Sequence, residues 1–221
     1  YPKGLRIKVI LSKKGGYQGM LEYIPGSYAH RPVNVKGYLF INCIFVGFKK
    51  EYKGRGFASL LINECIKEAK KKDMKGVAVV TRKGSFMVKK DIFLKKDFRV
   101  VDKAKPDFEL LAKKFIETAE NPQFKTDMTN QLAFYQNGLY VLRSPQCPYT
   151  EKNVNAILQS AEQNFQIKPK LIELQDIKDV QASPCPFGTF CIIYNGEIIS
   201  HHPISNTRFE NIMKKKIKTN A

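Results

Sequence analysis

Apolar residues follow two different spacings along the first half of this chain. The run from Tyr38 to Phe48 is apolar apart from an interruption at Asn42, which indicates a buried strand. Residues 57–72 carry an apolar stripe at helical spacing, formed by Leu60, Leu61, Cys65, Ile66 and Ala69. Residues 76–81 are almost continuously apolar, as is typical of a parallel strand. Strand, helix and parallel strand predict a βαβ unit.

Further elements are expected on either side of this unit. Residues 5–11 and 17–23 read as two strands, because a Ser-Lys-Lys-Gly-Gly turn signal separates them. We expect residues 85–96 to be helical. Residues 98–102 and 108–115 then predict a closing pair of strands.

A second α/β pattern follows a shift in composition at residues 120–124. It predicts strands at 138–143, 170–175, 189–194 and 197–201, a helix from Cys147 to about residue 164 and a last helix from residue 206. The chain is therefore expected to hold a mixed, largely antiparallel α/β domain at 1–120, a linker or helix at 121–135 and a second α/β domain at 136–221.

The composition bounds the class of protein. An apolar fraction of 43% in 221 residues fits a globular protein, and no apolar run approaches the ~20 residues of a membrane span. The net charge of +18 keeps a basic nucleic-acid-binding module open as an alternative. The lysines are spread over most of the chain, however, which favours a solvated surface that also attracts an anionic cofactor.

Five cysteines at irregular spacing, without a CxxC pair, argue against a disulfide framework and for a reducing cytoplasm. The three histidines lack zinc-site spacing, so we expect no metal. We expect no signal peptide, and since the chain begins at Tyr1, a trimmed start.

Gly54 and Gly56 lie in a basic loop between the strand that ends near Phe48 and the next helix. Backbone N–H groups and the positive end of a helix dipole converge at such a point, which predicts a phosphate or pyrophosphate site. The loop matches neither a Walker sequence nor the dinucleotide Gly-x-Gly-x-x-Gly pattern.

The loop resembles the acyl-CoA-binding loop of the GNAT superfamily of N-acetyltransferases, Arg/Gln-x-x-Gly-x-Gly/Ala. Lys53-Gly54-Arg55-Gly56-Phe57-Ala58 fits this motif, with Lys53 in place of Arg or Gln. The resemblance covers roughly residues 5–115, and the family's first strand and first helices have no counterpart.

This resemblance implies acetyl-CoA as cosubstrate and a direct attack by a small-molecule or peptidyl amine. Amides from Arg55 to Ser59 are expected to hold the pyrophosphate, with charge from Lys53 and Arg55. The strand before the loop is expected to diverge from its parallel neighbour and to offer backbone groups at Val46 and Phe48 to pantetheine and the thioester. The implied cofactor-binding residues are Val46, Phe48, Lys53, Gly54, Arg55, Gly56, Phe57, Ala58 and Ser59.

The resemblance leaves the acid and the base open. Phe93 stands where the family has a proton-donating tyrosine, so water or Cys43 could take that role. Glu22 is the candidate base, ahead of Tyr28 and His30, although a structural role is the simpler interpretation for each.

The second half carries Cys147-Pro148-Tyr149-Thr150, which resembles the glutaredoxin active site with Thr150 replacing the second cysteine. A helix opening at Cys147 would lower its pKa below ~8.5. Gly188 stands where a thioredoxin fold has a cis-proline. The domain is thus expected to be thioredoxin-like. Either it has lost its redox activity and serves in packing or substrate contact, or it is active through Cys147 with Cys185 as the resolving cysteine. Cys43, Cys65 and Cys191 are expected to be inert core residues.

Both halves together resemble the bacterial YoaP group. The main hypothesis is therefore a cytoplasmic, acetyl-CoA-dependent N-acetyltransferase with an unidentified acceptor. A glutaredoxin-like thiol-redox protein and a nucleic-acid-binding module are the alternatives.

Overall fold

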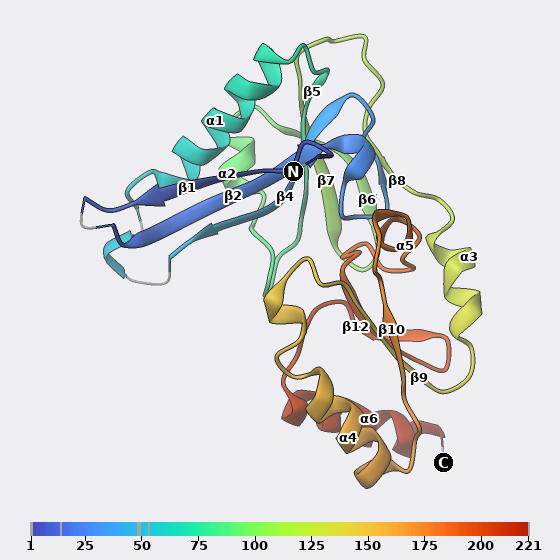
Figure 1. The fold of residues 1–221 in the computed structure, drawn as a ribbon. Coiled ribbons are helices and arrows are strands. Elements are labelled where there is room, and N and C mark those ends of the chain that lie inside the picture. The colour runs from blue at the N-terminus through green and yellow to red at the C-terminus, as the bar shows by residue number, and fades with distance from the viewer. Residues whose placement is uncertain (1, 14, 48–49, 53, 221) are drawn as a thin grey trace. The chain divides into compact units, whose positions relative to one another are not determined.

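The computed structural model describes residues 2–13, 15–47, 50–52 and 54–220 (Figure 1). The chain divides into two compact units. The first unit comprises Tyr1–Ala29 and Val33–Lys125, and the second comprises His30–Pro32 and Thr126–Ala221. The second unit is therefore assembled from two separate stretches of sequence.

The first unit is built on a six-stranded sheet with the order β1-β2-β4-β5-β7-β6. Only β4 and β5 pair in parallel, and the other neighbours are antiparallel. Its strands are β1 (Arg6–Leu11), β2 (Tyr17–Pro25), β4 (Tyr38–Val46), β5 (Gly76–Thr81), β6 (Arg99–Ala104) and β7 (Phe108–Lys114), and a small second sheet joins β3 (Val33–Asn34) to β8 (Gln123–Phe124). The predicted mixed α/β fold with a largely antiparallel sheet is confirmed.

Helix α1 (Phe57–Lys71) packs its apolar face against the sheet and so forms part of the first unit's hydrophobic core. Its buried residues, Leu61, Ile62, Cys65 and Ala69, pack against Leu21, Leu39, Val77 and Leu111 of the sheet. Leu60 was expected on this stripe, but it is 52% exposed because Ile62 takes the inward position. Phe93 is fully buried in the same cluster, 5.3 Å from Phe98 between ring centroids.

The helix predicted at residues 85–96 is much shorter than expected. Only α2 (Asp91–Leu94) is helical. Gly84 and Phe86 have φ values of 145° and 65°. These left-handed conformations are incompatible with a continuous right-handed helix, so the chain forms a loop before α2.

The second unit contains a four-stranded sheet with the order β10-β9-β11-β12. Strands β9 and β10 are parallel, whereas β11 is antiparallel to both β9 and β12. Its elements are α3 (Met128–Leu132), β9 (Leu139–Arg143), α4 (Val154–Phe165), β10 (Lys170–Glu173), α5 (Ile177–Gln181), β11 (Phe190–Tyr194), β12 (Glu197–Ser200) and α6 (Asn206–Asn220).

The expected helix start at Cys147 is wrong. Cys147 precedes a single 3-10 turn, Pro148–Thr150, and α4 begins only at Val154. The turn is closed locally, because the Thr150 amide and hydroxyl both donate to the Cys147 carbonyl, at 3.0 and 2.7 Å. Cys147 therefore does not lie at the N-terminus of an α-helix.

The segment His30–Pro32 packs onto the loop before β11. A Cβ atom at Gly188 would lie 2.9 Å from the His30 carbonyl oxygen and 3.0 Å from the Arg31 Cα. The Arg31 guanidinium lies 4.7 Å from the centroid of the Phe187 ring, and its Nη1 donates to Thr189 Oγ1 at 3.3 Å. Glycine at 188 thus permits this close backbone approach.

Candidate functional site

The central strand of the first unit contains a bulge. Between Glu22 and Tyr23 of β2 the register with β4 slips, so that Glu22 pairs with Cys43 and Tyr23 pairs with Ile41. Asn42 is the extra residue on β4. A bulge bends a strand and increases its twist, and bulges commonly re-aim strands beside functional sites.

Strands β4 and β5 stop pairing at this bulge. Their ladder runs from Tyr38 and Gly76 to Ile41 and Val79, although β4 continues to Val46. The Gly47 amide donates to the Gln18 carbonyl on β2 at 2.8 Å. Because backbone groups alternate in direction along a strand, those of Val46 point toward the β5 side. The two strands therefore diverge after Ile41 and Val79, as the resemblance of the glycine loop to the GNAT superfamily implied.

The turn that follows β4 is shaped by two glycines. Gly54 and Gly56 have φ values of 73° and 74°, a left-handed conformation that favours glycine. No heavy atom lies within 4 Å of a Cβ built at either position, so within the described residues the space above both is open. The turn could therefore accept a ligand close to its backbone.

Gly56 is the N-cap of α1, and none of the side chains that the structure describes caps it. The first hydrogen bond of the helix runs from the Leu60 amide to the Gly56 carbonyl at 2.9 Å. Among the described residues, the amides of Phe57, Ala58 and Ser59 have no acceptor. Such free N–H groups, together with the helix dipole, form an anion site.

Most of the cofactor-binding residues predicted from the sequence come together in this one segment. Val46 ends β4, and Gly54 to Ser59 form the turn and the first turn of α1. Arg55 is exposed, with its guanidinium 5.3 Å from the centroid of the Phe57 ring. Phe48 and Lys53 lie outside the described residues.

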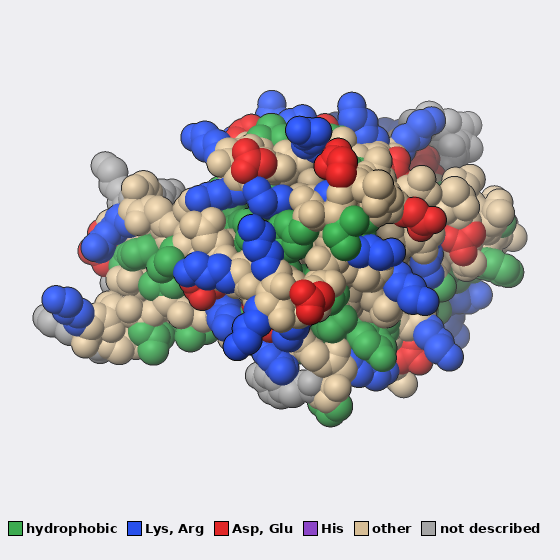
Figure 2. Space-filling model, turned by 90° about the horizontal axis from the view of Figure 1, so that it is seen from above, with side chains coloured by type: hydrophobic (Ala, Val, Ile, Leu, Met, Phe, Trp, Pro, Cys, Tyr) green, Lys and Arg blue, Asp and Glu red, His purple; other side chains and the backbone are tan. Residues whose placement is uncertain are grey.

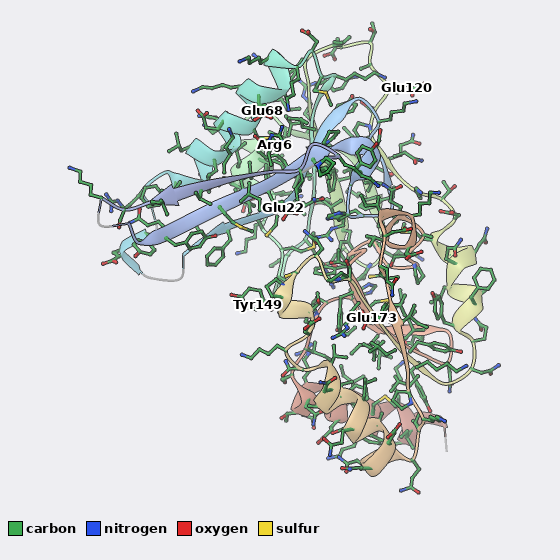
Figure 3. All side chains as sticks on the ribbon, viewed as in Figure 1. Arg6, Glu22, Glu68, Glu120, Tyr149 and Glu173 are labelled. Carbon is green, nitrogen blue, oxygen red and sulfur yellow. The ribbon has the colours of Figure 1, made fainter. Side chains whose placement is uncertain are left out.

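Glu22, the candidate base, is buried on β2 beside the bulge (Figure 3). Its neighbours Leu21 and Tyr23 face α1, so Glu22 projects from the opposite face of the sheet. Its Oε1 accepts a hydrogen bond from Asn42 Nδ2 at 3.0 Å. Sequence reasoning missed Asn42, although this residue was the polar interruption in the apolar run.

The two weaker candidate bases differ in position. Tyr28 ends the 3-10 helix Gly26–Tyr28 in the first unit, and Lys3 Nζ lies 5.3 Å from its ring centroid. His30 belongs to the second unit. Burial, aided by the charge of Arg31, lowers the pKa of His30 to about 4, so its imidazole is neutral at pH 7.

The second unit holds a buried thiol cluster that excludes Cys147. Cys185 Sγ lies 3.2 Å from His201 Nδ1, and the Cys185 thiol also contacts that of Cys191. Both cysteines are fully buried, whereas Cys147 is half-buried. Sequence reasoning missed His201, and Cys191 is a core residue that nevertheless contacts a second thiol.

The cluster changes the acidity of its thiols. Burial alone would raise the pKa of Cys185, but its hydrogen bonds with Cys191 and His201 outweigh burial and lower that pKa to about 5. Burial and the neighbouring Cys185 raise the pKa of Cys191. The two thiols are therefore unequal, and Cys185 is the more acidic of the pair.

Two classes of site find no support within the part of the chain that the structure describes. No group of three or more His, Cys, Asp or Glu side chains is placed to hold a metal ion. No described helix is both long enough and apolar enough to cross a membrane.

Residues 170–211 match the family described as YoaP-like. The chain is also similar to the Uncharacterized N-acetyltransferase YoaP of Bacillus subtilis (strain 168). The two are 27% identical over 195 residues, which cover 87% of this chain and 76% of that protein.

Solved structures similar to the chain include the PaiA N-acetyltransferase of Thermoplasma acidophilum in complex with coenzyme A. The match has 19% identity and a TM-score of 0.38, and covers 49% of this chain and 61% of that one. A Bacillus subtilis acetyltransferase in complex with CoA matches with 15% identity and a TM-score of 0.39, over 51% of this chain and 78% of that one. The relationship to the YoaP protein supports the enzyme class predicted from the sequence, an acyltransferase.

Proposed function

We propose that the chain is an acetyl-CoA-dependent N-acetyltransferase. The observation that carries this proposal is the combination of a left-handed Gly54–Gly56 turn with uncapped amides at the start of α1. A diphosphate carries the charge that such amides attract. The similarity to an N-acetyltransferase over 87% of the chain supports the same class.

The divergence of β4 from β5 gives the thioester a place beside the diphosphate. Pantetheine is expected to extend along β4, where backbone groups of Val46 can bind it and polarise the thioester carbonyl. The acceptor amine then attacks that carbonyl directly, and the CoA thiolate leaves. Glu22 is the proposed base, because it is buried beside the bulge and held by Asn42.

We further propose that the second unit has a thioredoxin-like fold. Its sheet order β10-β9-β11-β12, with β9 and β10 parallel, supports this assignment. The five cysteines are free thiols, which suits a reducing compartment.

A thiol-redox function is the second candidate, and one observation favours it. The Cys185 thiol beside His201 has an unusually low pKa, about 5, despite its burial. This contact moves the expected centre of any thiol chemistry from Cys147 to Cys185. The nucleic-acid alternative gains no comparable support, since basic and acidic side chains are interspersed on the face in Figure 2.

The test of the transferase compares acetyl-CoA with acetylpantetheine, which lacks the diphosphate and the nucleoside. Calorimetry should show acetyl-CoA binding at least about tenfold more tightly, because only acetyl-CoA reaches the α1 amides. Mass spectrometry of amine mixtures incubated with acetyl-CoA should detect acetylated product. Equal affinities for both thioesters would refute the proposed cofactor site.

A further inference from the structure

A cavity of about 800 Å³ lies in the first unit, and its lining includes none of the residues assigned to the cofactor. Its walls come from the end of β5, from the residues around the start of α2 and from the turn between β6 and β7. The cationic side chains on these walls are Arg82, Lys83, Lys89, Lys90, Lys103 and Lys105. The cavity is therefore strongly basic.

Carboxylates neutralise only part of this charge. Arg82 Nε pairs with Asp107 Oδ1 at 2.5 Å, and Lys90 Nζ pairs with Glu109 Oε1 at 2.9 Å. These ion pairs connect the end of β5 and the start of α2 to the residues around the β6–β7 turn. The Arg82 guanidinium also lies 4.8 Å from the centroid of the Phe108 ring. Asp91 is the remaining carboxylate of the lining.

The other four cations of the cavity are Lys83, Lys89, Lys103 and Lys105. Within the described residues, none of them forms an ion pair. Six cations line this cavity against three carboxylates, and such an excess raises the local positive potential and concentrates anions there. A ligand with a phosphate or carboxylate group would supply the missing negative charge.

The position of the cavity relates it to the transferase site. Thr81, which ends β5, lies in its wall. Because β4 and β5 are parallel, this is the edge of the sheet at which β4 ends and the chain turns into α1. The cofactor turn and the basic cavity thus lie at the same edge of one sheet.

We propose that this cavity binds an anionic group, a phosphate or a carboxylate, carried by one of the two substrates of the transferase. The assignment rests on the proposed function for its choice of ligand. Two molecules can bring that group to this edge: the acceptor amine, or CoA through its 3′-phosphate. The expected principal contacts are Lys83, which follows β5, and Lys105, which lies in the turn between β6 and β7.

The experiment uses the double variant Lys83→Gln/Lys105→Gln and the control Lys36→Gln/Lys71→Gln. The control removes the same charge at the opposite edge, because Lys36 precedes β4 and Lys71 ends α1. Calorimetry compares CoA with dephospho-CoA. Acetylation assays compare phosphoethanolamine with ethanolamine, and glycine with glycinamide. A ¹⁵N NMR titration of each protein with inorganic pyrophosphate reports anion binding without any catalysis.

Each pair consists of an anionic compound and its counterpart without the anionic group. For one of these pairs, the preference of the protein for the anionic compound should fall about tenfold in the cavity variant and stay unchanged in the control variant. Loss in the CoA pair identifies the 3′-phosphate, and loss in an amine pair identifies the acceptor. If no thioester binds, the transferase proposal fails, but the proposal of an anion site in the cavity does not fail with it. Chemical-shift changes at residues 82–83 and 103–107 on adding pyrophosphate would still support that anion site. Unchanged preferences, or shifts that persist in the cavity variant, overturn it.

Discussion

Asn42 Nδ2 donates a hydrogen bond to Glu22 Oε1 at 3.0 Å, across the bulge of β4. The bulge thus joins two features of the site: it ends the pairing of β4 with β5, and it supplies the donor that orients the buried carboxyl group. A carboxylate that is held in this way is suited to proton transfer beside the diverging strands.

Glu22→Gln tests that role. If Glu22 is the base, kcat should fall by roughly 10²–10⁴-fold, because proton removal from the amine is lost. The affinity for acetyl-CoA should stay unchanged, and the acidic limb of the pH profile of kcat/KM should disappear. Asn42→Ser, which removes this one hydrogen bond to the carboxyl group, should produce a smaller loss. A Gln variant with the full rate and an unaltered pH profile would assign Glu22 a purely structural role.

Gly56→Val tests the cofactor turn. The left-handed φ of 74° strains any branched side chain by about 1–2 kcal/mol, and the new methyl groups occupy the open space above the turn. Acetyl-CoA should bind at least about tenfold more weakly in calorimetry. Gly15→Val is the matched control, since Gly15 has a φ of 77° and no heavy atom within 4 Å of a built Cβ. Equal losses of affinity in both variants would separate the turn from the cofactor.

The Cys185–His201 contact predicts a thiolate at neutral pH. The pKa of Cys185 is lowered to about 5, so an ultraviolet thiolate titration should show one low step that Cys185→Ser abolishes. His201→Asn should raise its midpoint, whereas Cys65→Ser should leave it in place because burial raises the pKa of Cys65. A titration without any step below about pH 7, where an ordinary thiol of pKa ~8.5 stays protonated, would contradict the contact.

The same shift predicts how stability depends on pH. Between the native pKa of about 5 and the unfolded value of ~8.5, the unfolded chain binds more protons at Cys185 than the native protein does. The contribution of Cys185 to the free energy of unfolding is therefore complete above ~8.5 and is lost as the pH falls toward 5. Urea unfolding at a series of pH values should show this slope in the wild type and a smaller one in Cys185→Ser.

Gly188→Ala tests the packing of the His30–Pro32 segment. Its Cβ would come within 2.9 Å of the His30 carbonyl oxygen, and the φ of 76° adds strain. The free energy of unfolding should fall by about 2–4 kcal/mol in urea. Gly138→Ala carries similar strain, at a φ of 93°, but meets nothing within 4 Å. It should therefore cost only about 1–2 kcal/mol. Similar losses in both variants would mean that the segment yields to the added methyl group.

Local pattern was sufficient for much of the fold. The continuous apolar run at residues 76–81 predicted β5 with its bounds, and the stripe at residues 57–72 predicted α1 within one residue. Helix α5 was missed, yet its signal is local. Asp176 accepts hydrogen bonds from the amides of Lys178 and Asp179 in a capping box. The short β3–β8 pair was missed for a different reason, since its residues are distant in sequence and only the folded chain brings them together.

The candidate site divides in the same way. The glycine turn could be predicted because its chemistry lies in consecutive residues. The role of Asn42 could not, because a bulge depends on the register of a partner strand. Likewise, Cys185 and His201 are separated by a strand, a hairpin turn and a second strand, so no spacing rule links them. The error at Cys147 arose because Pro148 signals a helix start but fits a single 3-10 turn equally well.

The inclusion of His30–Pro32 in the second unit has a practical consequence for dissecting the protein. A fragment that starts at Thr126 would lack the peptide covering Gly188, and the aromatic ring of Phe187 would lose the guanidinium above it. Exchange of C-terminal halves between relatives would break the same junction. A fragment meant to contain the whole second unit must therefore also supply residues 30–32.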